Sequence, residues 1–142
     1  NVTLDTDGLK INFVNAVLFK SGSAAANKKY KTKVEKLMRI VANSANQYKV
    51  FVEGHTDDVP LRGHKRYKSN WELSAARSLT IARLLTGEHN ISGTRIIASG
   101  AGQYRPIAEN ETEEGRSKNR RTEIILSPNL DKIMNLLDKT KN

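Results

Sequence analysis

Five residues that could do chemistry close an apolar stretch of the chain, in the sequence YKVFVEGHTDDVP. His55, Asp57 and Asp58 are potential metal ligands with His64 nearby, and His55 and Asp57 would point the same way along a strand. No second cluster of histidines and carboxylates recurs, whereas a zinc or two-metal hydrolase needs several convergent ligands. We therefore expect no metal and no other cofactor.

General acid/base or nucleophilic catalysis is also disfavoured by the sequence. Asp57 and Asp58 are adjacent, so their side chains diverge and cannot readily share a proton. We assign Asp58 to capping the turn, a common role of aspartate. No Ser/His/Asp order stands out, and the segment at Gly22 lacks a G-x-S-x-G elbow. We expect a protein that is not an enzyme, with a metal-dependent hydrolase using His55 and Asp57 as a weaker alternative.

Arg77 is the most informative single residue. One helical turn to either side stand Leu73 and Ile81, so its charge lies in an apolar setting and needs a partner. One interpretation is a structural salt bridge to Glu53 or Asp57. The other is a guanidinium held rigidly for a carboxylate ligand, while Asp57 takes an ammonium group. The residues alone leave both interpretations open.

Length and composition limit the class of protein. The 142 residues suggest one domain, and the net charge of +9 favours anionic partners such as nucleic acid, a membrane surface or an anionic polymer. Aromatic residues make up only 6% of the chain, and no strand carries an aromatic pair for stacking bases, so we expect no nucleic acid. No stretch could span a membrane. Because the chain starts at Asn1 rather than Met, an excised fragment is expected, with any anchoring segment missing.

The hydrophobic pattern predicts strands alternating with helices. An apolar stripe marks a helix over residues 27–46, and a second begins at Ser69 or Asn70 and runs to about Thr86, with Ser69 and Glu72 at capping-box spacing. A short helix follows Thr112. Helical crossovers imply some parallel pairing, which predicts an α/β two-layer sandwich with a mixed sheet of about four strands. The predicted strands cover residues 8–19, with an irregular continuation, and residues 49–54, 94–102 and 121–127. The last of these could pair antiparallel at an edge of the sheet or between other strands.

Three motifs resemble one known family. They are VEGHTDDVPL, SNWELSAARS and RIIASGAGQYRPIAENETEEGRSKNRRTEIIL, preceded by VLFKSGSAAAN. In this order and spacing, GHTD, LSxxR and GRxxNRR are similar to the OmpA-like peptidoglycan-binding domain of OmpA, Pal and MotB. The resemblance covers residues 13–126. It implies a βαβαβ-type sandwich that binds the diaminopimelate of the stem peptide without catalysis.

The resemblance also implies roles for individual residues. Asp57 would meet the ammonium group of diaminopimelate, and Arg77 would meet its carboxylate. Asn70 would contact the ligand, and Arg120 would lie on the pocket side. Thr56 and Leu73 would form backbone or wall contacts. Among the remaining landmarks we expect a turn at Gly100 and Gly102, a loop shaped by Gly115 and Arg116, a structural Arg121 and a packed Trp71.

Two functional classes stay in play. The first is an envelope anchor that binds peptidoglycan, and the second is a MotB-like flagellar stator component that uses the same domain and could form a homodimer. Either implies a periplasmic domain whose full-length protein is attached to the outer or inner membrane through a missing N-terminal part. We divide the chain into a binding domain over residues 1–127 and a helical extension over residues 128–142, whose apolar face includes Leu130, Ile133 and Leu137.

Overall fold

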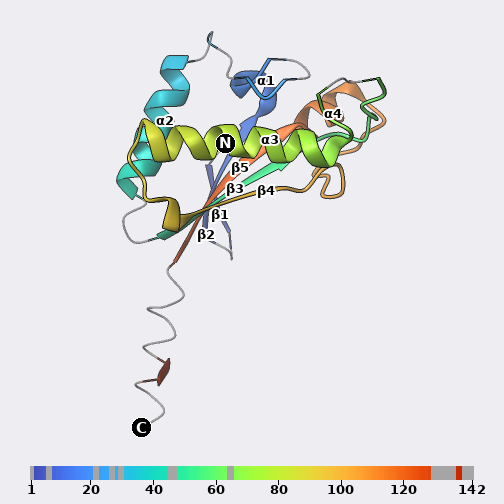
Figure 1. Ribbon diagram of the computed structural model, residues 1–142. Coiled ribbons are helices and arrows are strands. Elements are labelled where there is room, and N and C mark those ends of the chain that lie inside the picture. The colour runs from blue at the N-terminus through green and yellow to red at the C-terminus, as the bar shows by residue number, and fades with distance from the viewer. Residues whose placement is uncertain are drawn as a thin grey trace.

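A single mixed sheet organises the chain (Figure 1). The computed structural model describes residues 2–5, 8–20, 23–25, 28, 31–44, 48–63, 66–128 and 137–138. Five strands lie in the order β1-β2-β5-β3-β4. Among the strands of the described residues, β3 and β4 pair in parallel and the other three pairings are antiparallel. The strands are β1 Val2–Asp5, β2 Gly8–Val14, β3 Tyr48–His55, β4 Ile96–Gly100 and β5 Arg121–Pro128.

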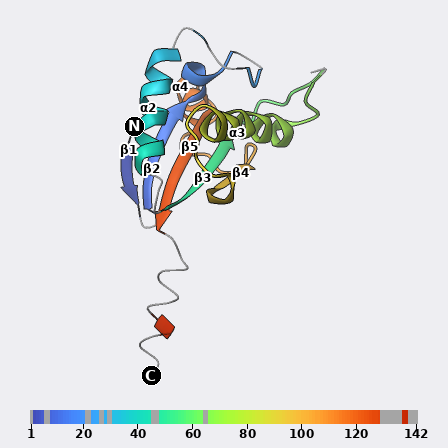
Figure 2. The same ribbon diagram turned by 60° about the vertical axis from the view of Figure 1, so that its left-hand side comes forward.

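The helices lie between these strands in the sequence. Figures 1 and 2 show α2 and α3 on the same face of the sheet, with α3 crossing the strands. Helix α3 forms the crossover between the parallel strands β3 and β4, as the alternating pattern predicted. The helical elements are α1 Asn15–Leu18, α2 Lys31–Ser44, α3 Asn70–Gly87, a 3₁₀ turn Gly93–Arg95 and α4 Glu113–Asn119.

The predicted α/β two-layer sandwich is confirmed, and the structure adds detail to it. A fifth strand, β1, pairs along β2, and the last strand, β5, lies between β2 and β3. The strand expected over residues 8–19, with its irregular continuation, is regular as far as Val14, and the buried Asn15 begins the short helix α1 that follows. The Asn15 side chain donates to the His55 carbonyl at 3.2 Å and accepts from the Thr122 hydroxyl at 2.9 Å.

The hydrophobic core lies between the sheet and these two helices. Apolar residues alternate along β3 and β5, so that every second side chain faces α2 and α3. The predicted helical stripes supply the opposite wall. The buried cluster includes Ile11, Phe13, Leu18, Phe19, Met38, Val50, Val52, Ile81, Leu85, Ile91, Ile124 and Leu126.

Two glycines let α3 approach the sheet closely. A Cβ on Gly54 would lie 2.1 Å from the Ser74 carbonyl oxygen, and one on Gly100 would lie 2.5 Å from the Ala75 nitrogen. Gly100 is thus the close-packed last residue of β4, which corrects the turn predicted there. The turn itself is made by Gly102, whose φ of +61° favours glycine.

The C-terminal helix predicted over residues 128–139 lies outside the described residues, apart from Leu137 and Asp138, which are helical. The division of the chain at residue 127 therefore stays a prediction. Within the described part, no helix is long and apolar enough to cross a membrane.

Candidate functional site

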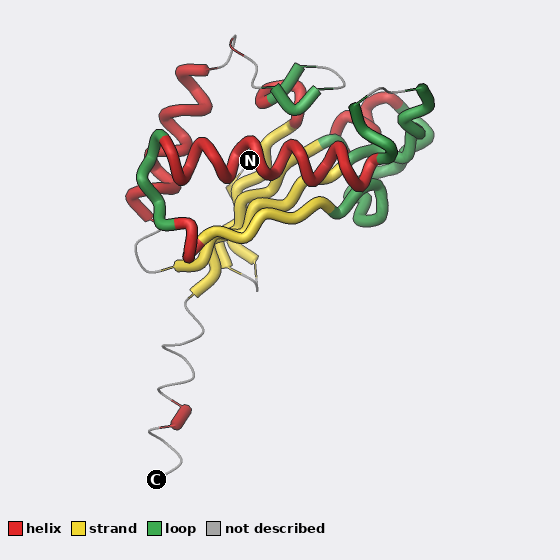
Figure 3. The backbone as a smooth tube through the Cα atoms, viewed as in Figure 1, coloured by secondary structure: helices red, strands yellow, loops and turns green. Residues whose placement is uncertain are grey.

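The GHTD residues lie where the sheet meets its loops. β3 ends at His55, and Thr56 and Asp57 follow it directly. Figure 3 shows loops gathered at this end of the sheet, beside the start of α3. Two backbone bonds fix this corner: Thr56 N–H donates to the Gly102 carbonyl, and Ala101 N–H donates to the Gly54 carbonyl, both at 2.9 Å. Both Thr56 and Asp57 are buried.

The two oxygens of the Asp57 carboxylate have different partners. Oδ1 accepts from the Val59 N–H at 3.0 Å, which caps the turn. Oδ2 accepts from Arg120 Nη1 at 2.7 Å. The capping role assigned to Asp58 is therefore wrong, because Asp57 performs it while Asp58 is exposed. Asp57 is thus held in a defined position by its own loop.

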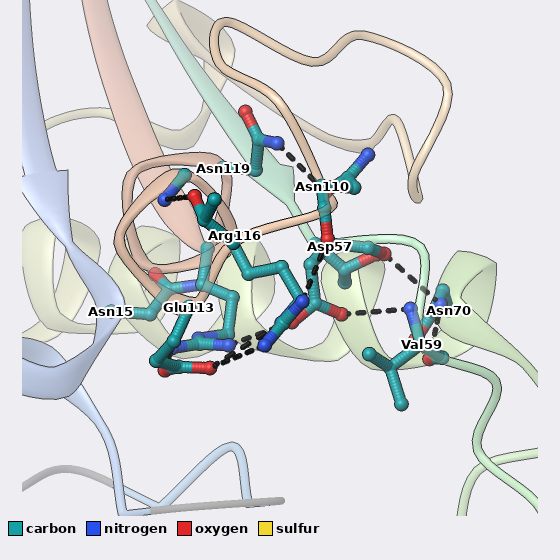
Figure 4. Close-up of polar contacts among 12 residues, drawn as sticks. Asn15, Asp57, Val59, Asn70, Asn110, Glu113, Arg116 and Asn119 are labelled. Carbon is teal, nitrogen blue, oxygen red and sulfur yellow. Dashed lines mark hydrogen bonds and ion pairs between the residues drawn. The ribbon is translucent and has the colours of Figure 1, made fainter.

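Arg120 bridges Asp57 to helix α4. Its Nη2 donates to Glu113 Oε1 at 2.5 Å, and Arg116 lies against the other oxygen of Glu113 at 3.3 Å. Figure 4 shows Glu113 and Arg116 beside Asp57, opposite Val59 and Asn70. Burial alone would lower the pKa of Arg120, but Glu113 and Asp57 outweigh it and raise the pKa. Arg120 therefore stays charged and already occupies one oxygen of Asp57.

Arg77 is a buried cation. It is 6% exposed, its Nε donates to the Ser23 carbonyl at 2.9 Å, and its guanidinium lies 5.3 Å from the centre of the Phe19 ring. Burial lowers its pKa; Tyr67 and Asp57 oppose this effect and Arg120 adds to it. The salt bridge considered with Glu53 or Asp57 is not formed: in the part of the chain that is described, Arg77 makes no ion pair.

Asn70, Thr56 and Leu73 line the same corner but face inward. The Asn70 amide donates to the carbonyls of Asp57 and Val59 and to Gln103 Oε1, at 3.1–3.3 Å. The Thr56 hydroxyl donates to the Asp57 carbonyl at 2.8 Å, and Leu73 is 4% exposed. Asn70 thus holds the Asp57 loop against α3 through hydrogen bonds, and Thr56 stabilises the same loop. Helix α3 starts as predicted, with the Ser69 hydroxyl accepting from Trp71 N–H.

Two buried residues of the NRR segment support this corner. Asn119 accepts from the backbone N–H groups of Ile107 and Ala108, and it donates to Ala108 and Asn110, at 2.8–2.9 Å. Arg121 donates to Glu123, Asn119 and Arg105, which agrees with the structural role expected for it. That Asn119 holds the loop at Ile107, Ala108 and Asn110 was not predicted, although a polar residue just before a buried strand can indicate such a buried hydrogen-bonding role.

Trp71 packs less than expected. It is 49% exposed and stacks on Tyr104, with ring centres 4.7 Å apart, over the Gly102 turn. The packing role predicted for Trp71 is therefore only partly right.

A second polar group lies on the opposite side of β3 and was missed. His55 is only 2% exposed and has Glu53 and Glu123 beside it rather than Asp57. Burial would lower the pKa of His55, but the two glutamates outweigh it and raise the pKa. Burial would raise the pKa of Glu123, but His55 and Arg121 lower it to about 2. Two features of the sequence could have indicated this polar group: a glutamate two residues before His55, and a second glutamate inside the apolar strand RTEIIL.

The arrangement of Asp57 and Arg77 indicates which kind of ligand this end of the sheet could bind. It presents a rigid carboxylate and a buried guanidinium from two elements that a hydrogen-bonded loop holds together. Such a pair is suited to binding a molecule that carries opposite charges. The hydrolase alternative is not supported, because the structure groups His55 with Glu53 and Glu123 and leaves Asp57 to Arg120 and Val59.

Comparison with known proteins gives the class. The model of the OmpA family matches residues 18–120, so the chain belongs to the OmpA family. Motility protein B of Bacillus subtilis is 31% identical over 125 residues, covering 88% of this chain and 47% of the relative. The chain spans about half the length of the first curated relatives it matches.

Solved structures agree with the family. The periplasmic domain of Helicobacter pylori MotB has a TM-score of 0.81 at 30% identity, covering 99% of this chain and 91% of that domain. The cell wall anchor of the T6SS from Pseudomonas aeruginosa has a TM-score of 0.81 at 31% identity, covering 91% of this chain and 87% of that anchor. Both likenesses confirm the predicted fold and family.

Proposed function

We propose that this domain binds peptidoglycan without catalysis and anchors an envelope protein to the cell wall. In this proposal the diaminopimelate of the stem peptide lies between Asp57 and Arg77. Asp57 takes the ammonium group and Arg77 takes the carboxylate. The domain would work in the periplasm, with membrane attachment supplied by another part of the protein.

One observation carries this proposal. Arg77 is a guanidinium at 6% exposure, and its partners within the described residues are a carbonyl and an aromatic ring, not a carboxylate. A charge removed from water in this way is costly unless an anion completes the site. A bound carboxylate would supply that anion beside a fixed acid. The similarity to a cell wall anchor is a second, independent support.

A binding measurement tests the proposal. The domain is titrated with a soluble stem peptide containing diaminopimelate, beside the variants Asp57→Asn and Arg77→Met. Loss of either charge should weaken binding by about 2–5 kcal/mol, because the opposite charge of the ligand would stay buried and unpaired. Two exposed residues serve as matched controls. Asp58→Asn removes the carboxylate next to Asp57, and Arg83→Met removes another guanidinium from α3, the helix that carries Arg77.

The ligand can be varied as sharply as the protein. A stem peptide with lysine in place of diaminopimelate keeps the ammonium group and lacks the carboxylate, so it should lose the contribution of Arg77. Binding that is equal for both peptides, or unchanged in both folded variants, would contradict the clamp. No binding by the parent would contradict peptidoglycan recognition through the stem peptide.

A MotB-like stator protein is the second candidate for the full-length protein. It is favoured by the similarity to motility protein B, which covers 88% of this chain. The same clamp would then anchor a motor, and self-association of the domain would be expected. Sedimentation velocity of the domain tests that part: a homodimer supports it and a strict monomer opposes it.

A further inference from the structure

The face of the sheet opposite the helices carries a cavity of about 990 Å³ that the clamp does not use. Its floor is charged, and it includes His55, Glu53, Glu123, Arg121 and Lys10. The walls come from the loop after β4 and from the first turn of α3. The cavity therefore gives solvent a path to a group of titratable side chains at the end of β3.

His55 is the anomalous member of this group. It is 2% exposed, and neither of its ring nitrogens has a hydrogen-bond partner among the residues that the structure describes. Nε2 lies 3.6 Å from Glu53 Oε1 and 3.6 Å from Glu123 Oε2. These separations are too long for good hydrogen bonds, and buried polar nitrogens seldom stay unsatisfied. Nε2 of the imidazole thus faces two carboxylates without close contact to either.

The strand register adds a second anomaly. Glu53 and Glu123 are direct cross-strand partners of β3 and β5, and like charges placed opposite each other are destabilising. A cation between the two carboxylates would remove this repulsion. His55, two residues along the same strand, adds a nitrogen ligand on the same face.

The spacing fits a metal ion. Two ligands bonded to tetrahedral zinc at about 2.0–2.1 Å are roughly 3.3–3.4 Å apart, close to the observed 3.6 Å. One ligand atom from each of the three residues lies within 4.8 Å of the others. We propose that Glu53, His55 and Glu123 form a binding site for a divalent transition metal such as Zn²⁺. Imidazole and carboxylate are ligands that suit this ion.

The surroundings are arranged for such a site. Arg121 Nε donates to Glu123 Oε1 at 2.9 Å, which orients the carboxylate and leaves Oε2 toward His55. The cavity supplies the open position for a fourth ligand, which would be water. Lys10 Nζ lies 3.6 Å from Glu123 Oε2 and would compete with the metal, so the ion must displace a flexible ammonium group.

Bound metal would join β3 to β5 at His55, the residue directly before Thr56. It would therefore stabilise the strand end from which the Asp57 loop departs. Because an ion that binds the folded chain alone raises its stability by mass action, zinc should raise the melting temperature. The site differs from the clamp in its residues and lies on the other side of β3.

The test is zinc titration of untagged protein that has been freed of metal by a chelator. We expect one Zn²⁺ per chain by calorimetry at pH 7, a higher melting temperature, and the visible absorption bands of tetrahedral Co²⁺ when cobalt replaces zinc. Glu53→Gln should weaken affinity by at least roughly tenfold. The Glu53 side chain is 29% exposed, so this variant should fold even if one at His55 does not. Lys10→Met should strengthen zinc binding several-fold, because it removes the competing charge.

Two controls isolate the site. Glu114→Gln removes an exposed carboxylate, and His64→Gln with His89→Gln removes the other two histidines of the chain; both should keep parental zinc affinity. Absence of zinc binding by the folded parent would overturn the proposal and leave a proton on His55 as the cation between the glutamates. Zinc binding that survives unchanged in Glu53→Gln, or that disappears in the histidine control, would overturn it as well.

Discussion

Two buried arginines of this domain are in opposite electrostatic situations. Arg121 is 3% exposed and donates to Glu123 and to two carbonyl oxygens, so its charge is neutralised inside the protein. Arg77 is 6% exposed, and within the described residues it donates to a carbonyl and lies near an aromatic ring. The free energy of unfolding should therefore respond differently to their removal.

We expect Arg121→Met to lower the free energy of unfolding by about 3–5 kcal/mol, because it leaves Glu123 buried without its hydrogen-bonded partner. Arg77→Met should change it by less than about 1 kcal/mol, since the lost bond to Ser23 is offset by the desolvation cost that is removed. Urea denaturation of both variants measures this difference. A large loss for Arg77→Met would show that the charge is structural and would weaken its assignment to a ligand.

The prediction of individual residues from the sequence succeeded where burial alone decides. Arg77 stands one helical turn from Leu73 and Ile81, so its apolar surroundings could be read from the spacing, and both neighbours are buried. The partner of Asp57 could not be predicted in the same way. Arg120 lies 63 residues further on, and its choice of Asp57 depends on where α4 places it.

At the scale of elements, the contact between α3 and the sheet depends on two glycines. Gly54→Ala and Gly100→Ala should each destabilise the fold by at least about 1–3 kcal/mol, because the added Cβ would meet backbone atoms at 2.1 and 2.5 Å. Gly87→Ala is the control. Gly87 lies in the last turn of α3, where an added Cβ would have no neighbour within 4 Å, so this variant should be neutral or slightly stabilising. Thermal unfolding checks all three. Equal effects at the three positions would contradict close packing.

Helix α4 should tune the clamp through one exposed carboxylate. Glu113 holds Nη2 of Arg120 while Nη1 holds Asp57, so Glu113 neutralises a cation that competes with a ligand ammonium. The pKa of Glu113 is lowered, chiefly by its hydrogen bond with Arg120. Glu113→Gln should weaken stem-peptide binding by roughly threefold, an effect typical of exposed ion pairs.

A double-mutant cycle decides whether that effect passes through Arg120. In an Arg120→Gln background, Glu113→Gln should have no further effect on the dissociation constant. Glu114→Gln is the matched control, because Glu114 is the next residue and its described ion pair is with Lys118 at 3.9 Å. If Glu113→Gln weakens binding equally with and without Arg120, the proposed coupling is wrong.

Elements were predicted best where a helix or strand has a strong period and a local start signal. The N-cap at Ser69 and the short helix after Thr112 are confirmed, because each depends on a side chain two or three residues away. An irregular continuation of β2 was predicted, but its start after Val14 was not. The position where the strand ends depends on Asn15, whose side chain forms hydrogen bonds with His55 and Thr122. Both partners are distant in the sequence, so no local pattern predicts them.

At the scale of the whole molecule, the layer architecture followed from the alternation of strands and helices, while the strand order did not. β1 is only four residues long, and it joins the sheet by pairing along β2. The position of β5 between β2 and β3 comes from long-range pairing, which sequence spacing cannot specify.

Net charge is the property of the whole molecule that bears most directly on the proposed function. With 24 cationic and 15 anionic residues the chain carries +9, so it should be attracted to anionic polymers of the cell wall in addition to any stem peptide it clamps. Added salt screens exposed charges more than buried ones. Affinity for intact cell wall should therefore depend on salt more steeply than affinity for a soluble stem peptide.

We expect co-sedimentation with purified cell wall to weaken by at least roughly tenfold between 50 mM and 0.5 M NaCl, while calorimetric binding of the stem peptide changes much less. Cell wall stripped of its anionic polymers is the control, and its salt dependence should fall to that of the stem peptide. Equal salt dependence for all three ligands would mean that the basic surface contributes nothing beyond the clamp. Cell-wall binding that persists in Asp57→Asn at low salt and disappears at high salt would separate the two contributions directly.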